Sequence, residues 1–259
     1  MERIILIETS TALCSTALAE DGTITSYRES SAPKAHASLT AVFVQEMLSE
    51  RGLTLADCDA VCVSMGPGSY TGLRVGVSTA KGLCFGSGKP LLAVGTLDTL
   101  VAQAADEAGA AGRADAAGRA DVAGRAGQYR YIIPMIDARR MEVYTAVFEP
   151  TGASATANGS EDTLSYRQIT ETAPVIIDEN SFAKELEAGP VLFIGDGAGK
   201  CADVIKHPNA NFCQCHPKAS AMLSPALEAF RMGDFKDVAY FEPFYLKEFV
   251  ATVSKKKLF

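Results

Sequence analysis

The sequence predicts an α/β protein built from two similar lobes. Three observations support this: three strand-like segments open the chain, apolar strands and helices alternate after them, and a strand–loop–strand pattern from the start recurs in the second half. The chain has 259 residues. It is therefore long enough for one large domain or two modest ones, since a domain usually takes ~100–200 residues.

The first hundred residues predict the element order strand, strand, strand, helix, strand, helix, strand, helix. Aliphatic residues at 3–8 and alternating segments at 14–20 and 23–30 indicate three strands, with Asp21 and Gly22 as a turn. This order is typical of a ribonuclease-H-like lobe. The elements expected after the strands are a helix at 36–51, a strand at 59–64, a helix at 71–86, a strand at 90–95 and a helix at 96–108.

Residues 133–151 repeat the pattern of residues 4–22 without a gap. Each copy has an aliphatic strand that ends in an acidic residue, Glu8 or Asp137, and then a short polar or basic loop and a second strand. Internal duplication explains this match better than chance does. Two copies of one lobe are then expected to face each other across a cleft.

A hexapeptide written three times, AAGRAD-AAGRAD-VAGRAG, separates the two copies. Its period fits neither a helix nor a strand, and it has no large apolar side chain, so it predicts a surface insertion without a function. We therefore divide the chain into a first lobe at 1–108, the insertion at 109–127, and a second lobe with an aromatic tail at 128–259. The last helix, at 220–235, is free to pack back on the first lobe.

Composition argues against several classes of protein. The net charge of −7 disfavours a stand-alone nucleic-acid binder. The seven cysteines lie mostly inside apolar runs, and the start of the chain lacks a signal-peptide layout, which indicates a reducing cytoplasm. No apolar stretch approaches the ~20 residues that cross a bilayer. We expect a soluble cytoplasmic protein that does not bind membranes.

Duplicated hairpins with an acid after the first strand also suggest an actin-like ATP hydrolase or a sugar kinase. In such enzymes the hairpin turns hold phosphates and the acids hold a metal ion. Glycine in such a turn lets backbone N–H groups approach the phosphate oxygens. The turns here, TSTALC and ARRMEV, contain no glycine. A stand-alone ATP hydrolase or kinase is therefore the alternative hypothesis. The candidate vestigial nucleotide site consists of Glu8, Asp137, Gly195 and Gly197, although the GDGAGK segment favours a plain tight turn.

No catalytic or metal motif is complete. The three histidines, His36, His207 and His216, contain no pair with metal-ligand spacing on a helix, and neither HExxH nor GxSxG occurs. Cysteines and histidines at 201–216 fit no common zinc module. We expect no catalytic residue, no metal ion and no cofactor.

The segment SMGPGSYTGLR at 64–74 joins a buried strand to a helix. Its glycine spacing matches neither the P-loop nor the dinucleotide fingerprint, and it contains no lysine. We interpret it as a signature loop that makes a tight exit from the strand, with a serine or threonine cap for the helix and one nearby cation. Its residues of interest are Gly66, Pro67, Gly68, Ser69, Thr71 and Arg74.

Small residues at four-residue spacing leave one face of the helix at 71–86 nearly bare. Because glycine costs ~1 kcal/mol against alanine at an exposed helix position, this face predicts close approach of another backbone. That backbone belongs either to the chain's own sheet or to a partner helix, and the helix at 36–51 offers a similar surface. The predicted partner-interface residues are His36, Leu39, Phe43, Gly72, Gly76, Ala80 and Cys84.

Four segments resemble the bacterial TsaB family of tRNA threonylcarbamoyladenosine biosynthesis proteins, also called YeaZ-type and once classed as glycoprotease-like. They are ILIETSTALCSTAL, HASLT, SMGPGSYTGLRVGVSTAKGL and IDARRMEVYTAVF. The resemblance implies an ASKHA (actin-like ATPase) fold with two ribonuclease-H-like lobes. It also implies a non-catalytic paralogue that binds and stabilises TsaD, the subunit that transfers threonylcarbamoyl to the adenosine next to the anticodon.

The same resemblance implies further partners. TsaE joins a larger complex, tRNA is contacted mainly through that complex, and a homodimer forms through the same helices when the chain is alone. TsaD-type enzymes carry two metal-binding histidines on a first-lobe helix, whereas His36 has no second histidine near it, which fits a lost metal site. The older peptidase label lacks support, because neither a metal pair nor a nucleophile constellation is present.

Overall fold

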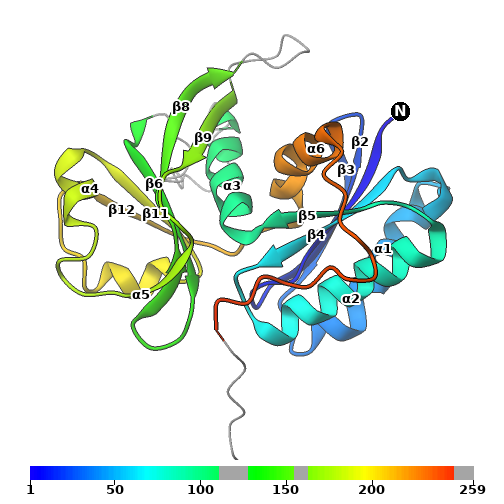
Figure 1. Cartoon of the computed structure of the whole chain (residues 1–259), viewed down its shortest axis with the longest axis horizontal. Coiled ribbons are helices and arrows are strands. Elements are labelled where there is room, and N and C mark those ends of the chain that lie inside the picture. Colours follow the sequence, from blue (N-terminus) through cyan, green and yellow to red (C-terminus); the bar gives the residue numbers. More distant parts are fainter. Residues whose placement is uncertain (111–127, 155–162, 248–259) are drawn as a thin grey trace, which may run out of the picture.

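The computed structural model describes residues 1–110, 128–154 and 163–247. Figure 1 shows two lobes side by side, each with its own sheet, and helix α3 (Thr96–Ala110) between them. The hexapeptide repeat lies outside the described residues, apart from Ala110 at the end of α3, and the basic run at 255–257 also lies outside them.

The first lobe contains a five-stranded sheet with the order β3-β2-β1-β4-β5. β1 pairs antiparallel with β2 and parallel with β4, so the opening strands and the later strand–helix units share one sheet. The predicted strands are confirmed, with boundaries that differ by a residue or two. Their bounds are β1 Arg3–Glu8, β2 Cys14–Glu20, β3 Thr23–Ser30, β4 Ala60–Gly66 and β5 Leu91–Gly95.

Helices cover both faces of this sheet because residues of β1 point alternately to each side. Ile5 and Ile7 pack in the cluster that contains residues of α1 (Ala35–Glu50) and α2 (Tyr70–Ser87). Ile4 and Leu6 pack against the opposite layer, formed by the 3-10 turn η3 (Ala219–Met222) and helix α6 (Leu223–Met232). The last helix therefore packs on the first lobe.

The second lobe repeats this strand order as β10-β7-β6-β11-β12. α3 packs on one face of its sheet, and α4 (Ala183–Ala188) and α5 (Ala198–Ala202) lie with the core cluster on the other. The strands are β6 Tyr131–Asp137, β7 Glu142–Thr145, β8 Phe148–Ser154, β9 Thr163–Gln168, β10 Ala173–Ile176, β11 Val191–Gly195 and β12 Ala210–Gln214.

The two sheets also agree in strand direction. The central strand, β1 or β6, is antiparallel to its hairpin partner and parallel to the next strand of the sheet. They differ in the second strand of the hairpin. β2 runs unbroken to Glu20, whereas in the second lobe β7 ends at Thr145, and β8 begins at Phe148 and pairs mainly with β9.

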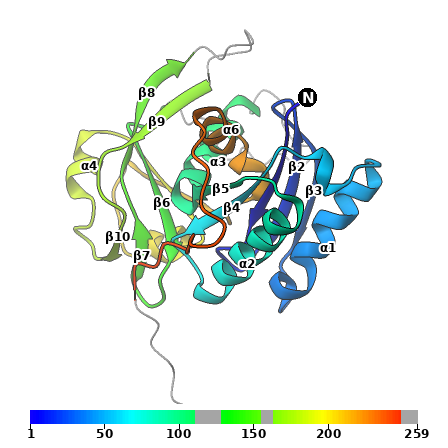
Figure 2. The same ribbon diagram turned by 45° about the vertical axis from the view of Figure 1, so that its right-hand side comes forward.

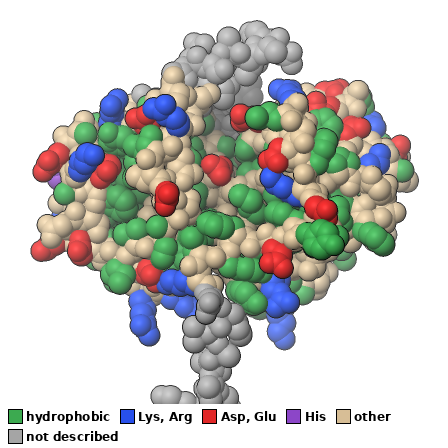
Figure 3. All heavy atoms as spheres, viewed as in Figure 1, with side chains coloured by type: hydrophobic (Ala, Val, Ile, Leu, Met, Phe, Trp, Pro, Cys, Tyr) green, Lys and Arg blue, Asp and Glu red, His purple; other side chains and the backbone are tan. Residues whose placement is uncertain are grey.

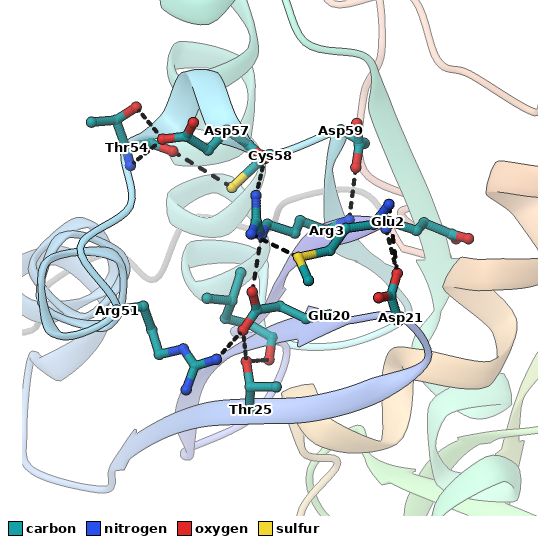
Figure 4. Close-up of polar contacts among 12 residues, drawn as sticks. Glu2, Arg3, Glu20, Asp21, Thr25, Arg51, Thr54, Asp57, Cys58 and Asp59 are labelled. Carbon is teal, nitrogen blue, oxygen red and sulfur yellow. Dashed lines mark hydrogen bonds and ion pairs between the residues drawn. The ribbon is translucent and has the colours of Figure 1, made fainter.

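A polar network ties together the edge of the first lobe where β1 begins (Figure 4). The Glu20 carboxylate accepts hydrogen bonds from Arg3 Nε at 2.9 Å, Arg51 Nη2 at 2.6 Å and Thr25 Oγ1 at 2.8 Å. These contacts lower the pKa of the Glu20 carboxyl. The hydrogen bond from Arg3 has the largest effect, and the bond from Thr25 has the next largest. The network joins β1, β2 and β3 to the residue that ends α1, so it fixes one end of the sheet against its covering helix.

Candidate functional site

A cleft of about 680 Å³ lies between the two lobes. The first hairpin turn, the signature loop, His36 and the second hairpin turn all line it, together with residues of the C-terminal tail. The structure thus brings residues of two predicted sites into one cleft. Asp137 comes from the candidate nucleotide site, and the signature loop contributes Pro67, Gly68, Ser69 and Thr71.

The signature loop makes the expected tight exit from β4 into α2. Gly66 has φ +108°, a left-handed value that favours glycine, and the Gly66–Pro67 peptide bond is cis. Ser69 is the N-cap of α2, since its side chain accepts a hydrogen bond from Gly72 N at 3.3 Å. Of the two predicted caps, Ser69 is confirmed, and Thr71 lies exposed in the first turn of the helix.

A row of glycines in α2 and the loop before it packs against the first hairpin turn. Ser69 N donates a hydrogen bond to Ser10 O at 2.6 Å, and Thr9 Oγ1 donates one to Gly72 O at 2.9 Å. A Cβ atom at Gly68 would overlap Ser10, and one at Gly72 would overlap the Thr9 carbonyl oxygen. The glycines are needed for this approach of the chain's own backbone.

The prediction that the small-residue face of α2 contacts a partner is wrong for the four residues that define it. Gly72 and Gly76 are buried beneath Thr9, and Ala80 and Cys84 are 0% and 1% exposed in the first-lobe core. The chain's own hairpin and sheet use this face. A bulky side chain at Gly76 would therefore disturb the fold itself.

The three α1 residues predicted for the interface have different surroundings. His36 Nε2 is 2.8 Å from Thr11 O, so the half-buried ring closes over the first hairpin turn. Leu39 and Phe43 are half-buried on the same helix, which leaves part of each side chain at the surface. His36 therefore contributes to the wall of the cleft.

The outer surface of α1 and α2 carries exposed apolar side chains that the sequence analysis did not select. Phe85 is 86% exposed and Val42 is 41% exposed. Between the helices lies a pocket of about 350 Å³ with Val44, Leu48 and Leu83 in its lining. Figure 3 shows hydrophobic side chains at the surface in the lower right part of the molecule, where α1 and α2 lie in Figure 1. The sequence does contain a signal for Phe85. At about 3.6 residues per turn it lies on the side of the helix opposite the stripe of small residues, and that stripe is the buried face.

Glu8 lies beneath the cleft rather than in its wall. The side chain is fully buried, and Oε1 accepts a hydrogen bond from Ser10 N at 2.6 Å. Among the described residues, Oε2 has no hydrogen-bond partner. Burial is the main cause that raises the pKa of this carboxyl to about 7. Glu8 therefore holds the hairpin turn from inside.

Asp137 is engaged by a lysine whose role the sequence analysis missed. Lys200 Nζ donates to Asp137 Oδ1 at 2.5 Å and to the carbonyl oxygens of Arg140 at 2.7 Å and Glu142 at 2.6 Å. The second hairpin turn thus directs carbonyl oxygens at an ammonium group. A phosphate cradle requires the opposite arrangement, because phosphate oxygens accept hydrogen bonds from backbone N–H groups.

Two of the three glycines of GDGAGK, Gly195 and Gly197, serve the packing of β11 on β6. Gly195 has φ +133°, and a Cβ atom there would overlap Met135 O. Gly197 N donates to the same carbonyl oxygen at 3.0 Å. Between them, Asp196 Oδ1 accepts a hydrogen bond from Asp137 N at 2.9 Å, and burial raises the pKa of Asp196. This segment is a tight turn against the second hairpin.

The described part of the chain contains neither a metal-ligand cluster nor a membrane-spanning helix. No group of three or more His, Cys, Asp or Glu side chains is arranged to hold a metal ion. No helix there has the length and apolar character that crossing a membrane requires.

These contacts define a two-lobed α/β protein with an interlobe cleft lined by two hairpin turns. Side chains of the chain itself bind both turns, His36 the first and Lys200 the second. A family model described as TsaD, tRNA N6-adenosine threonylcarbamoyltransferase, matches residues 28–255. The tRNA threonylcarbamoyladenosine biosynthesis protein TsaB of Escherichia coli K12 is 31% identical over 254 residues, which cover 96% of each chain. The chain belongs to the TsaB family.

Two further similarities agree with this assignment. A crystal structure from Pseudomonas aeruginosa, described as an uncharacterized protein with similarity to peptidase YeaZ, has 25% identity and a TM-score of 0.74, and the match covers 95% of this chain and 100% of that one. A tRNA N6-adenosine threonylcarbamoyltransferase of Maricaulis maris is 43% identical over 67 residues, which cover 26% of this chain and 18% of that protein.

Two glycines of α2 provide a matched test of the packing on the first hairpin turn. Gly76→Ala should lower the free energy of unfolding by ~1–3 kcal/mol, because its Cβ overlaps the buried Thr9 hydroxyl. Gly82→Ala should raise it by up to ~1 kcal/mol, since no described atom lies within 4 Å of a Cβ there. Urea unfolding of both variants measures the difference, and equal effects would contradict the packing role.

The buried carboxyl of Glu8 should make stability fall as pH rises. Its folded pKa of about 7 lies above its ordinary value of 4.5. The protonated form therefore stabilises the fold fully below pH 4.5, and this contribution is lost as pH rises through 7. Relative to Glu8→Gln, which does not titrate, the wild type should lose on the order of 3 kcal/mol over this window. Urea unfolding at a series of pH values measures it, and parallel curves for the two proteins would refute the assignment.

Proposed function

We propose that this chain is a non-catalytic subunit of tRNA threonylcarbamoyladenosine synthesis that binds and stabilises TsaD. Its membership of the TsaB family supports a role in this modification. The observation that carries the non-catalytic part is the contact of Lys200 with Asp137 and with two turn carbonyls. The cation occupies the turn where an actin-like enzyme would offer N–H groups to phosphate.

We infer that the two lobes are ribonuclease-H-like units of an ASKHA fold that arose by duplication. The matching strand orders and directions of the two sheets support this inference. So does the constant offset between the two hairpins in the sequence. In this history, the split between β7 and β8 is a later change in the second copy.

The surface we propose for TsaD is the outer face of α1 and α2, in place of the buried glycine row. Phe85 and Val42 are its exposed apolar side chains, and Leu39 and Phe43 extend it along α1. Exposed aromatic and apolar side chains are typical anchors of protein interfaces. The proposed homodimer uses the same face, while TsaE and tRNA join through the larger complex.

Charged substitutions on this face should weaken TsaD binding without unfolding the chain. Phe85→Glu and Val42→Glu each place a charge on an exposed position, so thermal stability should change little. Affinity for purified TsaD should fall by at least about tenfold, measured by titration calorimetry. Ile176→Glu, 74% exposed on β10 of the second lobe, is the matched control. Equal affinity of Phe85→Glu and the control would contradict the proposed surface.

The alternative function, a stand-alone ATP hydrolase or kinase, retains one favourable observation, the interlobe cleft of about 680 Å³. If the chain is non-catalytic, the purified protein should release phosphate from ATP no faster than buffer does, and Asp137→Asn should not change that rate. Hydrolysis that Asp137→Asn removes would favour the alternative and overturn the proposal.

A further inference from the structure

A segment that is not part of either sheet connects the two lobes on the side of the cleft. We call residues 236–247 the strap. They follow the turn that ends α6, run along α2 and then cross to β7 of the second lobe, as both Figure 1 and Figure 2 show. The strap supplies Phe244, Tyr245 and Lys247 to the lining of the cleft.

The first part of the strap is held on the first lobe by backbone and core contacts. Lys236 N donates a hydrogen bond to Leu91 O at 2.8 Å, an isolated bridge that holds the start of the strap beside β5. Lys81 Nζ of α2 donates to the carbonyl oxygens of Ala239 at 3.0 Å and Phe241 at 3.1 Å. The Phe241 side chain packs against the first-lobe core. This part is therefore anchored at several points.

The middle of the strap binds the signature loop. Phe244 N donates to Met65 O at 2.7 Å. Phe244 O lies 2.9 Å from the position that a Cβ atom would take at Gly66, so a side chain there would displace the strap. The Tyr245 ring packs on the ring of Tyr70, with centroids 4.9 Å apart. The loop that starts α2 thus has a second contact, independent of the first hairpin turn.

The second-lobe end of the strap rests on Lys247. Its ammonium group forms an ion pair with the Glu142 carboxylate and lies 5.7 Å from the centroid of the Tyr144 ring. The side chains of Lys247 and Glu142 are 41% and 23% exposed. Ion pairs of this kind are weak and are screened by salt. The two ends therefore differ: many contacts hold the first lobe, and a screened charge pair holds the second.

We propose that the strap is a releasable tie between the lobes, which sets the width of the cleft and opens it when Lys247 leaves Glu142. Helix α3 packs against the second-lobe sheet and also contacts β4 and β5 of the first lobe, so it joins the lobes independently of the strap. Release of Lys247 frees the second hairpin turn from the strap while the first-lobe anchors remain. The inference does not depend on TsaD binding, because none of these contacts involves the exposed residues Phe85 and Val42.

Hydrogen exchange of the full chain, followed by mass spectrometry, tests the tie. Lys247→Ala and Glu142→Ala should each increase exchange severalfold in peptides over 138–144 and 65–70, which face the cleft. The double variant Lys247→Glu with Glu142→Lys should restore wild-type exchange, because the pair is rebuilt with reversed charges. Lys206→Ala, whose ammonium group donates to Ala202 O on the same lobe, is the matched control.

Salt provides a second readout. Exchange over 138–144 should rise with sodium chloride in the wild type and should be insensitive to it in Lys247→Ala, because only the former has a charge pair to screen. Exchange in Lys247→Ala equal to that in Lys206→Ala would overturn the proposal. So would an increase that the charge-reversed double variant does not restore, or one that extends equally to β11, since that would indicate general destabilisation.

Discussion

The close contact between the first hairpin turn and the glycine row of α2 is the constraint on which the site depends. Gly68 and Gly72 let the backbone at Ser10 and Thr9 lie directly on the start of the helix, and Gly76 admits the Thr9 hydroxyl. Glycine inside a helix costs ~1 kcal/mol against alanine, and this cost is offset only if the contact it allows is made. The contact fixes the turn after β1 against the helix that follows β4, and so positions one wall of the cleft.

Much of the fold follows from local patterns, and its exceptions follow from distant partners. Alternation and helical spacing gave the strands and helices of the first lobe within a residue or two, because those elements bury regular faces. The break between Thr145 and Phe148 could not be predicted in this way, since the aligned segment in the first lobe is a continuous strand. The break arises because β8 pairs with β9, which lies later in the chain.

The glycine row shows why a correct pattern led to a wrong surface. A stripe of small residues indicates that a backbone comes close, but it does not identify the backbone. Here the deciding partner is Thr9, more than sixty residues away, and its hydroxyl bond to Gly72 O is a tertiary contact with no local signal. Similarly, GDGAGK marked a turn, while the contact of Lys200 with Asp137 depends on β11 lying beside β6.

The signature loop is the place where these contacts meet. Its glycines accept the first hairpin turn on one side, and Gly66 admits Phe244 of the strap on the other. Ser69, between them, caps α2 and donates its backbone N–H to Ser10 O. A change in the cleft that moves the loop therefore moves the start of α2, whose outer face is the surface proposed for TsaD. Because interiors are close-packed, such a shift is transmitted along the rigid helix, so the cleft and the partner surface share one mechanical element.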